Sequence, residues 1–201
     1  WVNDEKSWRQ FLSNIEMTTD LHRLHIMGGE PTVNKKFHSF IDWLISNSLT
    51  NFGFSFVTNG AKLDSELLAK LKNFREVDIE ISVESTGPTN DYVRQGGNYI
   101  ETWDTIERLT KHQTENFKIV LRSVPQLLTI NTYHEYIIKA SELNLSIQGI
   151  PCTWPEYLAV SVLPQDIRDS FKENYVNVKN SLSIDGPVNT IAVGRDTSRL
   201  D

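Results

Sequence analysis

Apolar residues at helical spacing alternate along this chain with short apolar runs of the kind that form strands. At the start, Trp8, Phe11, Leu12 and Ile15 repeat at i, i+3, i+4 and i+7, which predicts an amphipathic helix. Strands are then predicted at 23–27, 52–57, 77–84, 117–124 and 145–150, each followed by a helix. This alternation predicts an α/β fold of parallel strands joined by right-handed crossovers.

The helices after the strands are predicted from their apolar stripes. The stripe residues are Phe37, Phe40, Ile41, Leu44 and Leu49; Leu67, Leu68, Leu71 and Phe74; Trp103, Ile106 and Leu109; Tyr133, Tyr136, Ile137 and Ala140; Ile167, Phe171, Tyr175 and Val178. From Ser181 we expect a loop with a short strand at 191–193. A helix at the start of an alternating fold implies a strand before it, so we interpret the chain as a fragment whose first strand is missing.

Two architectures fit the alternation: an open doubly wound sheet and a curved (β/α) barrel. In the third strand Asp78, Glu80, Ser82 and Glu84 share one face. A central strand of a doubly wound sheet is covered on both faces and should be almost wholly apolar. A closed eight-stranded barrel also fills its interior with apolar side chains. The polar face therefore favours a partial, open, TIM-like barrel that holds a ligand, with a half-solvated edge strand as the alternative.

Other polar residues are expected on the same interior face as these four. They are His25, Ser55, Asn59, Arg122, Ser146 and Gln148. Glu80 and Arg122 on neighbouring strands could form an ion pair with no further role.

Glycine or polar residues end the strands, at the edge where parallel α/β folds bind ligands. The first strand runs into Gly28-Gly29-Glu30-Pro31, where two glycines leave the backbone open to a small molecule and Glu30 offers a carboxylate to an ammonium group. The alternative is a turn that uses glycine only for its dihedral angles. The later strand ends are Thr58-Asn59-Gly60, Ser82-Val83-Glu84 and Arg122.

Two of these polar positions have equally good explanations without a ligand. Asn98 follows Gly96-Gly97 at a helix start, where free N–H groups suit a carboxylate, but Asn98 with Glu101 also matches a capping box. Asn59 can adopt the positive φ of a turn.

The order of these motifs on successive strands resembles the radical S-adenosylmethionine (SAM) superfamily, and specifically its branch with a short C-terminal twitch extension. The resemblance covers about residues 20–165 and includes the segment 154–164, which leads into the twitch region. It implies a partial barrel core over residues 1–165, followed by a C-terminal helix and the start of the extension over 166–201. It also implies SAM-binding residues, namely Gly28, Gly29, Glu30, Pro31, Asn59, Ser82, Glu84, Asn98, Arg122 and Pro151.

The resemblance assigns parts of SAM to some of these residues. The glycine pair and Glu30 would bind the amino group of the methionyl part, and Glu84 would contact the ribose. Asn98, where the family often has Ser, would hold the carboxylate with Arg122. Pro151 would lie near the adenine.

One departure accompanies the resemblance. The family motif C-x3-C-x2-C supplies three thiolates to a [4Fe–4S] cluster, whose electron cleaves SAM to a 5′-deoxyadenosyl radical in intact members. This chain has a single cysteine, Cys152. Its five histidines are not spaced as ligands on one helix, so no metal site is expected. We therefore expect the chain by itself to hold no cluster and to be inactive.

Composition limits the remaining possibilities. The 201 residues, 39% hydrophobic and 23% charged, fit one globular domain. A net charge of −6 without a Lys/Arg stripe argues against a nucleic-acid surface. No apolar run reaches the ~20 residues of a membrane helix, and no signal-peptide pattern opens the sequence. Together with one cysteine, this predicts a cytoplasmic protein.

Three functions follow from these observations. The favoured one is the core of a radical SAM enzyme with an unidentified substrate, a small molecule or a peptide, and possible reduction by an electron-donor protein. The second is a cluster-less binding module for a nucleoside or amino acid. The third is an ordinary α/β enzyme with Glu80 or Glu84 as a general base, for which the sequence offers no nucleophile–base pair.

Overall fold

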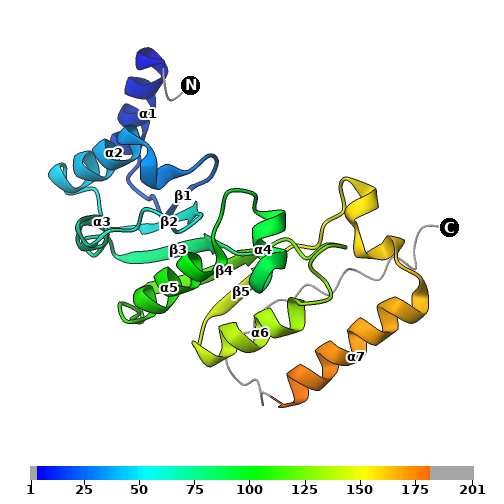
Figure 1. Ribbon diagram of the computed structural model, residues 1–201. Helices are drawn as coiled ribbons and strands as arrows, with labels where there is room; N and C mark the ends of the chain where they lie inside the picture. Colours follow the sequence, from blue (N-terminus) through cyan, green and yellow to red (C-terminus); the bar gives the residue numbers. More distant parts are fainter. Residues whose placement is uncertain (1–3, 182–201) are drawn as a thin grey trace. The chain divides into compact units, whose positions relative to one another are not determined.

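Five strands form one sheet in a computed structural model, which describes residues 4–181 (Figure 1). The strands are β1 (Arg23–Ile26), β2 (Gly53–Thr58), β3 (Glu76–Ser82), β4 (Phe117–Ser123) and β5 (Ser146–Gly149). They are hydrogen-bonded in the order β1-β2-β3-β4-β5, and the β1–β2 and β4–β5 pairs are parallel. A doubly wound sheet changes direction at a switch point. The uninterrupted chain order is instead that of a (β/α) barrel, which decides between the two predicted architectures.

The predicted helices are all present. They are α1 (Glu5–Met17), α2 (Lys35–Ser46), α3 (Ser65–Leu71), α5 (Tyr99–Thr110), α6 (Tyr133–Glu142) and α7 (Gln165–Ser181). Leu49 and Phe74, predicted in apolar stripes, lie beyond the ends of α2 and α3. Helix α4 (Gly87–Val93) and the short 3-10 helices η1 (Pro31–Val33), η2 (Glu156–Leu158) and η3 (Val160–Val162) were not predicted. The strand predicted at 191–193 lies outside the described residues.

Side-chain caps explain where several helices begin. Asp4, Asn34, Asp64 and Asn98 each accept a hydrogen bond from a backbone N–H in the first turn of α1, α2, α3 and α5. Such a cap satisfies a donor that the helix itself leaves unpaired. These short polar residues therefore set four of the helix starts.

The chain groups into two compact units. The first comprises Trp1–Glu80 with His112–Lys118, and the second Ile81–Lys111 with Ile119–Asp201. This division differs from the boundary predicted at residue 165, which stays a prediction.

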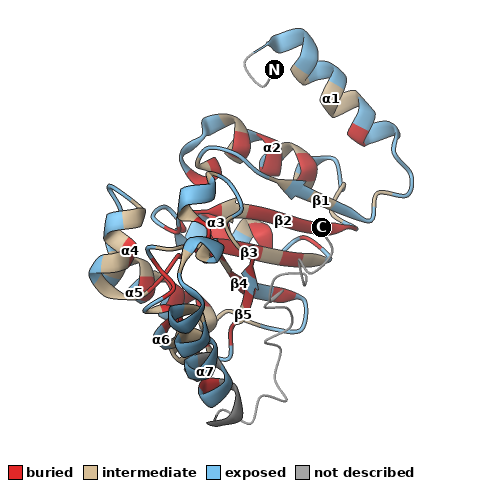
Figure 2. Cartoon of the chain, turned by 90° about the vertical axis from the view of Figure 1, so that its right-hand side faces the viewer, coloured by how far each residue is buried: buried red, intermediate tan, exposed pale blue. Residues whose placement is uncertain are grey.

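Aromatic side chains build the core of the first unit. The ring of Phe37 on α2 lies 5.2 Å from that of Phe56 on β2, and the ring of Phe74 lies 4.7 Å from that of Phe54. Figure 2 shows the buried residues on β2 and on the inner sides of α2 and α3, whereas α1 is mostly exposed. Burial of these phenylalanines packs α2 and the segment after α3 against β2. This packing holds the end of β2 in a defined position.

In the second unit, α5 and α6 contribute Trp103, Tyr133 and Tyr136, all at most 1% exposed. The Tyr133 hydroxyl lies 2.6 Å from Ser123 Oγ on β4. Burial raises the pKa of Tyr133 to about 12 and raises that of Tyr136 as well. Both phenols are therefore neutral across the physiological range.

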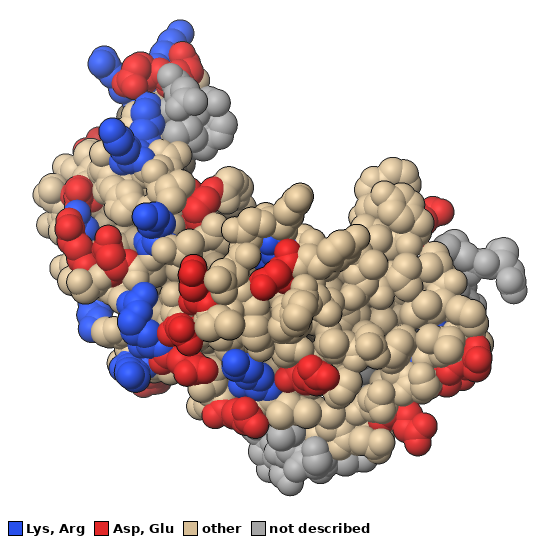
Figure 3. Space-filling model, in the orientation of Figure 1, with Lys and Arg blue, Asp and Glu red and all other residues tan. Residues whose placement is uncertain are grey.

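Charged side chains of both signs share the surface. On the face shown in Figure 3, Lys and Arg are interspersed with Asp and Glu instead of forming a basic stripe. Within the described part of the chain, every helix is too short or too polar to cross a bilayer.

Candidate functional site

The turn after β1 has the open backbone that its sequence predicts. Gly28 and Gly29 have φ of 100° and 56°, in the region that favours glycine. A Cβ built on either glycine meets no atom within 4 Å. The turn therefore uses the dihedral angles that glycine favours, and the space beside both glycines is open; their role in binding a ligand stays a prediction.

Glu30 is fixed by the strand end beside it. Its Oε1 accepts hydrogen bonds from Thr32 Oγ1 at 2.7 Å and Thr58 Oγ1 at 2.6 Å, and its Oε2 accepts one from the Asn59 backbone N–H at 2.6 Å. Pro31 starts the 3-10 helix η1 that Glu30 caps. Because a carboxylate has about four acceptor positions, Oε2 retains the capacity to accept from an ammonium group.

Asn59 contributes to the turn differently from the prediction. Its backbone φ is not positive, and Gly60 adopts the positive φ of 83° instead. The Asn59 side chain accepts from the Ala61 N–H at 2.9 Å, which closes a turn of the type Asn and Asp favour. The expectation of a positive φ at Asn59 is therefore wrong, and glycine takes that role because it has no Cβ.

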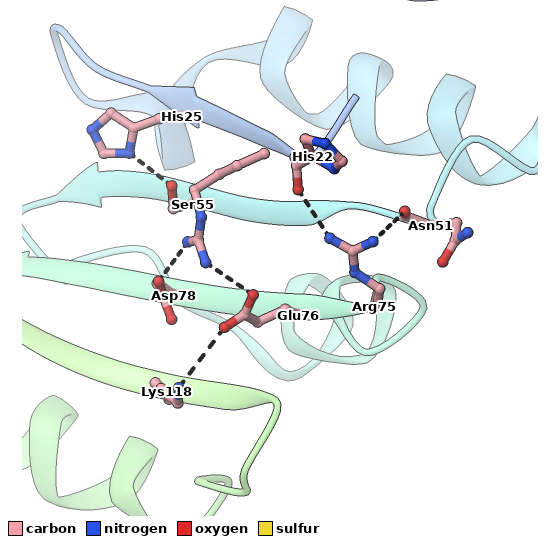
Figure 4. Close-up of polar contacts among 9 residues, drawn as sticks. His22, His25, Asn51, Ser55, Arg75, Glu76, Asp78 and Lys118 are labelled. Carbon is pink, nitrogen blue, oxygen red and sulfur yellow. Dashed lines mark hydrogen bonds and ion pairs between the residues drawn. The ribbon is translucent and has the colours of Figure 1, made fainter. Parts of the chain in front are cut away.

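The polar face predicted for the strands is present in the first unit (Figure 4). His25 Nδ1 lies 2.8 Å from Ser55 Oγ and 3.4 Å from Glu80 Oε1. Towards the start of the strands, the Arg23 guanidinium bonds Asp78 at 2.6 Å and Glu76 at 2.9 Å. The sequence predicted the shared face but not these partners.

In the second unit, Glu84 follows β3 and is 8% exposed. Its Oε1 accepts from Arg94 Nη1 at 2.9 Å, and its Oε2 accepts from the Val124 backbone N–H at 2.6 Å. The Asn90 side chain of α4 accepts from the Glu84 N–H at 3.0 Å. Glu84, which is predicted to contact the ribose, is thus a buried carboxylate that accepts one hydrogen bond from the Arg94 guanidinium and one from the Val124 backbone N–H.

Ser82 and Arg122 lie on adjacent strands near Glu84. The Val83 N–H donates to the Arg122 carbonyl at 2.9 Å, which brings the two strand ends together. The β4–β5 register pairs Arg122 with Gln148, so these two predicted interior residues share a face. Both Ser82 and Arg122 are half-buried.

Asn98 is confirmed as the N-cap of α5. Its Oδ1 accepts from the Glu101 N–H at 3.2 Å, while its Nδ2 donates to Glu101 Oε1 at 3.3 Å. In a full capping box the Asn98 backbone N–H would donate to the Glu101 carboxylate; here the hydrogen bond to this carboxylate comes from the Asn98 side chain. Gly96 before it has φ of 86°.

Pro151 lies in the segment after β5 that contains several exposed apolar residues. The Cys152 N–H donates to the Pro125 carbonyl at 2.9 Å, so this segment runs beside the end of β4. Ile150, Trp154 and Tyr157 are 61%, 81% and 71% exposed. Around residues 150–163, Figure 3 shows little charge.

Sequence reasoning missed two residues of these arrangements, Thr58 and Arg94. From the sequence, Thr58 is only part of a polar strand end and has no assigned role, although its hydroxyl bonds Glu30. Arg94 lies ten residues beyond Glu84, at the C-terminal end of α4 and before a glycine pair, and its charge was the only signal in the sequence that could have indicated it.

Comparison with known proteins identifies the family. The sequence profile of the radical SAM superfamily matches residues 3–128. The chain belongs to the radical SAM superfamily.

Curated relatives agree with this membership. Mycofactocin maturase MftC of Mycobacterium ulcerans is 33% identical over 87 residues, which are 43% of this chain and 23% of that protein. MftC of Mycolicibacterium smegmatis is 32% identical over 97 residues, or 48% and 24% of the two chains. This chain thus matches about a quarter of the length of these curated relatives.

Two solved structures share the fold. Streptococcus suis SuiB bound to the precursor peptide SuiA gives a TM-score of 0.62 at 12% identity, over 89% of this chain and 40% of SuiB. A domain of pyruvate-formate lyase-activating enzyme from Bacteroides vulgatus gives 0.54 at 12% identity, over 78% and 94% of the two chains. These likenesses confirm the predicted partial-barrel fold class.

Proposed function

We propose that the protein containing this chain is an enzyme that binds SAM at the glycine turn after β1 and cleaves it reductively. When bound, SAM would supply a sulfonium whose one-electron reduction would break its bond to C5′, giving methionine and a 5′-deoxyadenosyl radical. The observation that supports the proposal most strongly is Glu30. Its carboxylate is oriented by Thr58 and the Asn59 N–H beside two glycines with open space above them.

The residues of the turn fit the amino group of SAM. A carboxylate accepts charge-assisted hydrogen bonds from an ammonium group, and Oε2 of Glu30 has one donor among the described residues. We assign the ribose to Glu84, the methionyl carboxylate to Asn98 and Arg122, and the adenine neighbourhood to Pro151. Ser82, Asn59 and Pro31 would line the same cofactor.

The [4Fe–4S] cluster of the family does not fit this chain's own residues. The sequence has one cysteine, whereas the cluster needs three thiolates. Within residues 4–181, no group of three His, Cys, Asp or Glu could hold a metal ion. We propose that the cluster ligands come from outside this sequence, and that a twitch-type extension follows the barrel core.

The remaining parts of the proposal concern partners and location. We expect the substrate to be a small molecule or a peptide, and the electron to come from a donor protein in a reducing cytoplasm. A cluster-less module that binds a nucleoside or amino acid is the competing function.

Anaerobic reconstitution tests the proposal. The intact protein, supplied with iron, sulfide and SAM, should release 5′-deoxyadenosine and methionine when dithionite is added, and none without the reductant. Glu30→Ala and Arg122→Ala should each lower that release at least tenfold. A protein that binds SAM and assembles a cluster but releases no 5′-deoxyadenosine would contradict the proposal, and SAM binding without any cluster would favour the binding module.

A further inference from the structure

Three polar side chains from consecutive strands of the first unit meet on one face. His25 lies on β1, Ser55 on β2 and Glu80 on β3, and the β1–β2 register pairs His25 directly with Ser55. His25 Nδ1 lies 2.8 Å from Ser55 Oγ and 3.4 Å from Glu80 Oε1. Figure 4 shows the imidazole above the strand with its Nδ1 directed at Ser55.

The three residues differ in burial. Ser55 and Glu80 are 1% and 6% exposed, whereas the His25 side chain is 30% exposed. A buried carboxylate is costly unless hydrogen-bond donors surround it. Among the described residues, the hydrogen bond of the His25 ring joins Nδ1 to Ser55 Oγ, so Nε2 is the nitrogen available to a ligand.

The position of the ring proton follows from these contacts. The Glu80 carboxylate oxygen lies 3.4 Å from Nδ1 and favours a proton on that nitrogen, because its negative charge attracts the positive end of an N–H group and repels a lone pair. The Ser55 hydroxyl can accept from the same N–H. Nε2 then retains its lone pair, which is how a carboxylate behind a histidine sets the tautomer in many sites.

We propose that His25 is a proton-accepting group of the ligand site and that Glu80 positions it. The ligand group would be a hydroxyl or an ammonium, which donates a hydrogen bond to Nε2. In a full transfer, the proton moves to Nε2, the electron pair stays on the ligand oxygen or nitrogen, and the imidazolium that forms faces the Glu80 carboxylate.

The position along β1 indicates which ligand this is. His25 precedes Gly28 by three residues, which is about 10 Å along a strand at ~3.3 Å per residue. The proposed function assigns the glycine turn to the amino group of SAM. Because His25 lies about 10 Å from that turn, we place the substrate, and not SAM, at His25; this step rests on the proposed function. The nitrogen of His25 that carries the proton is set by Ser55 and Glu80 of this chain, so it should be the same whether or not SAM is bound.

Nitrogen NMR of 15N-histidine-labelled protein prepared without iron tests the tautomer. The His25 signal is assigned by its loss in His25→Gln, and it should report a proton on Nδ1 and a bare Nε2. His38 is an internal control that should show the other tautomer. Its Nε2 lies 2.8 Å from the Thr32 carbonyl and must donate to it, so its proton should be on Nε2. Glu80→Gln should lower the Nδ1–H population of His25 and leave His38 unchanged. A proton on Nε2 of His25, or the same spectrum in Glu80→Gln, would overturn the proposal.

Acylation by diethyl pyrocarbonate gives a second measurement that needs no substitution. The unprotonated Nε2 attacks a carbonyl carbon of the reagent, and ethyl carbonate leaves. Peptide mass spectrometry should show His25 modified at least fivefold faster than His38. Equal or slower modification of His25 would contradict an available Nε2, whereas absence of SAM cleavage alone would count only against the proposed function.

Discussion

The Tyr133 hydroxyl shows how closely single atoms are placed behind the strand ends. It lies 2.6 Å from Ser123 Oγ, and a Cβ built on Gly149 would lie 2.7 Å from it. A glycine at this position of β5 is therefore required by a close approach, and not by its dihedral angles. Sequence alone gave no reason to single out Gly149, because the contact joins residues on different elements.

Gly149→Ala should therefore destabilise the protein by about 1–3 kcal/mol through overpacking. In a Tyr133→Phe background the same change should cost at least about 1 kcal/mol less, since the clashing oxygen is gone. Urea unfolding of the four proteins measures this coupling. If the losses in unfolding free energy of the two single substitutions simply add up in the double variant, the Gly149→Ala strain does not come from the Tyr133 hydroxyl.

Tyr133 also makes stability depend on alkaline pH. Its pKa is about 12 in the folded protein because of burial, against 10.0 for an exposed tyrosine. Below pH 10 both states are protonated and the stabilisation is complete. Between pH 10 and 12 the unfolded chain releases a proton that the folded chain retains, so the free energy of unfolding should fall by up to about 3 kcal/mol.

Urea titrations at several pH values measure this loss. Tyr133→Phe should have a shallower decline from pH 10 to 12 than the wild type, although Ser123 loses a partner at every pH. Tyr157→Phe is the control, because Tyr157 is 71% exposed and should leave the decline unchanged. Equal slopes in Tyr133→Phe and wild type would refute the assignment.

Helices and strands were predictable where a hydrophobic stripe or a cap defined them. The stripe of Trp103, Ile106 and Leu109 and the cap residue Asn98 placed α5 correctly. Helix α4 was missed because its one buried residue is polar: Asn90 accepts from the Glu84 N–H instead of packing in an apolar core. A helix fixed by a polar contact has no apolar period to detect.

The cap at Asn98 separates a structural role from a cofactor role. Asn98→Ala should lower the free energy of unfolding by about 1 kcal/mol, whereas Asn98→Ser should keep it within a few tenths, since Ser also caps helices well. If Asn98 additionally binds the methionyl carboxylate, Asn98→Ala should weaken SAM binding severalfold, with Asn98→Ser closer to wild type. Thermal denaturation measures the stability and titration calorimetry measures the SAM affinity. Unchanged SAM affinity in Asn98→Ala would show that Asn98 caps the helix and does not bind SAM.

For the whole molecule, the polarity of one strand face was enough to predict the architecture. The alternation of Asp78 and Glu80 with buried Val77 and Ile79 argued against a doubly wound sheet, and the sequential strand order agrees. The pairings within the site were not predictable, because Arg23 with Asp78 and Arg94 with Glu84 depend on side-chain reach between segments. The substrate likewise depends on parts that the sequence pattern does not specify.

The central claim is that Glu30 at the glycine turn binds the SAM amino group. Calorimetric titration of SAM into the reconstituted intact protein tests it most directly. Glu30→Gln should raise the Kd about tenfold or more, because a charge-assisted hydrogen bond contributes about 1.5–3 kcal/mol. Glu16→Gln, an exposed change on α1, should keep the Kd within twofold. A folded Glu30→Gln protein that binds SAM as tightly as the wild type would contradict the account.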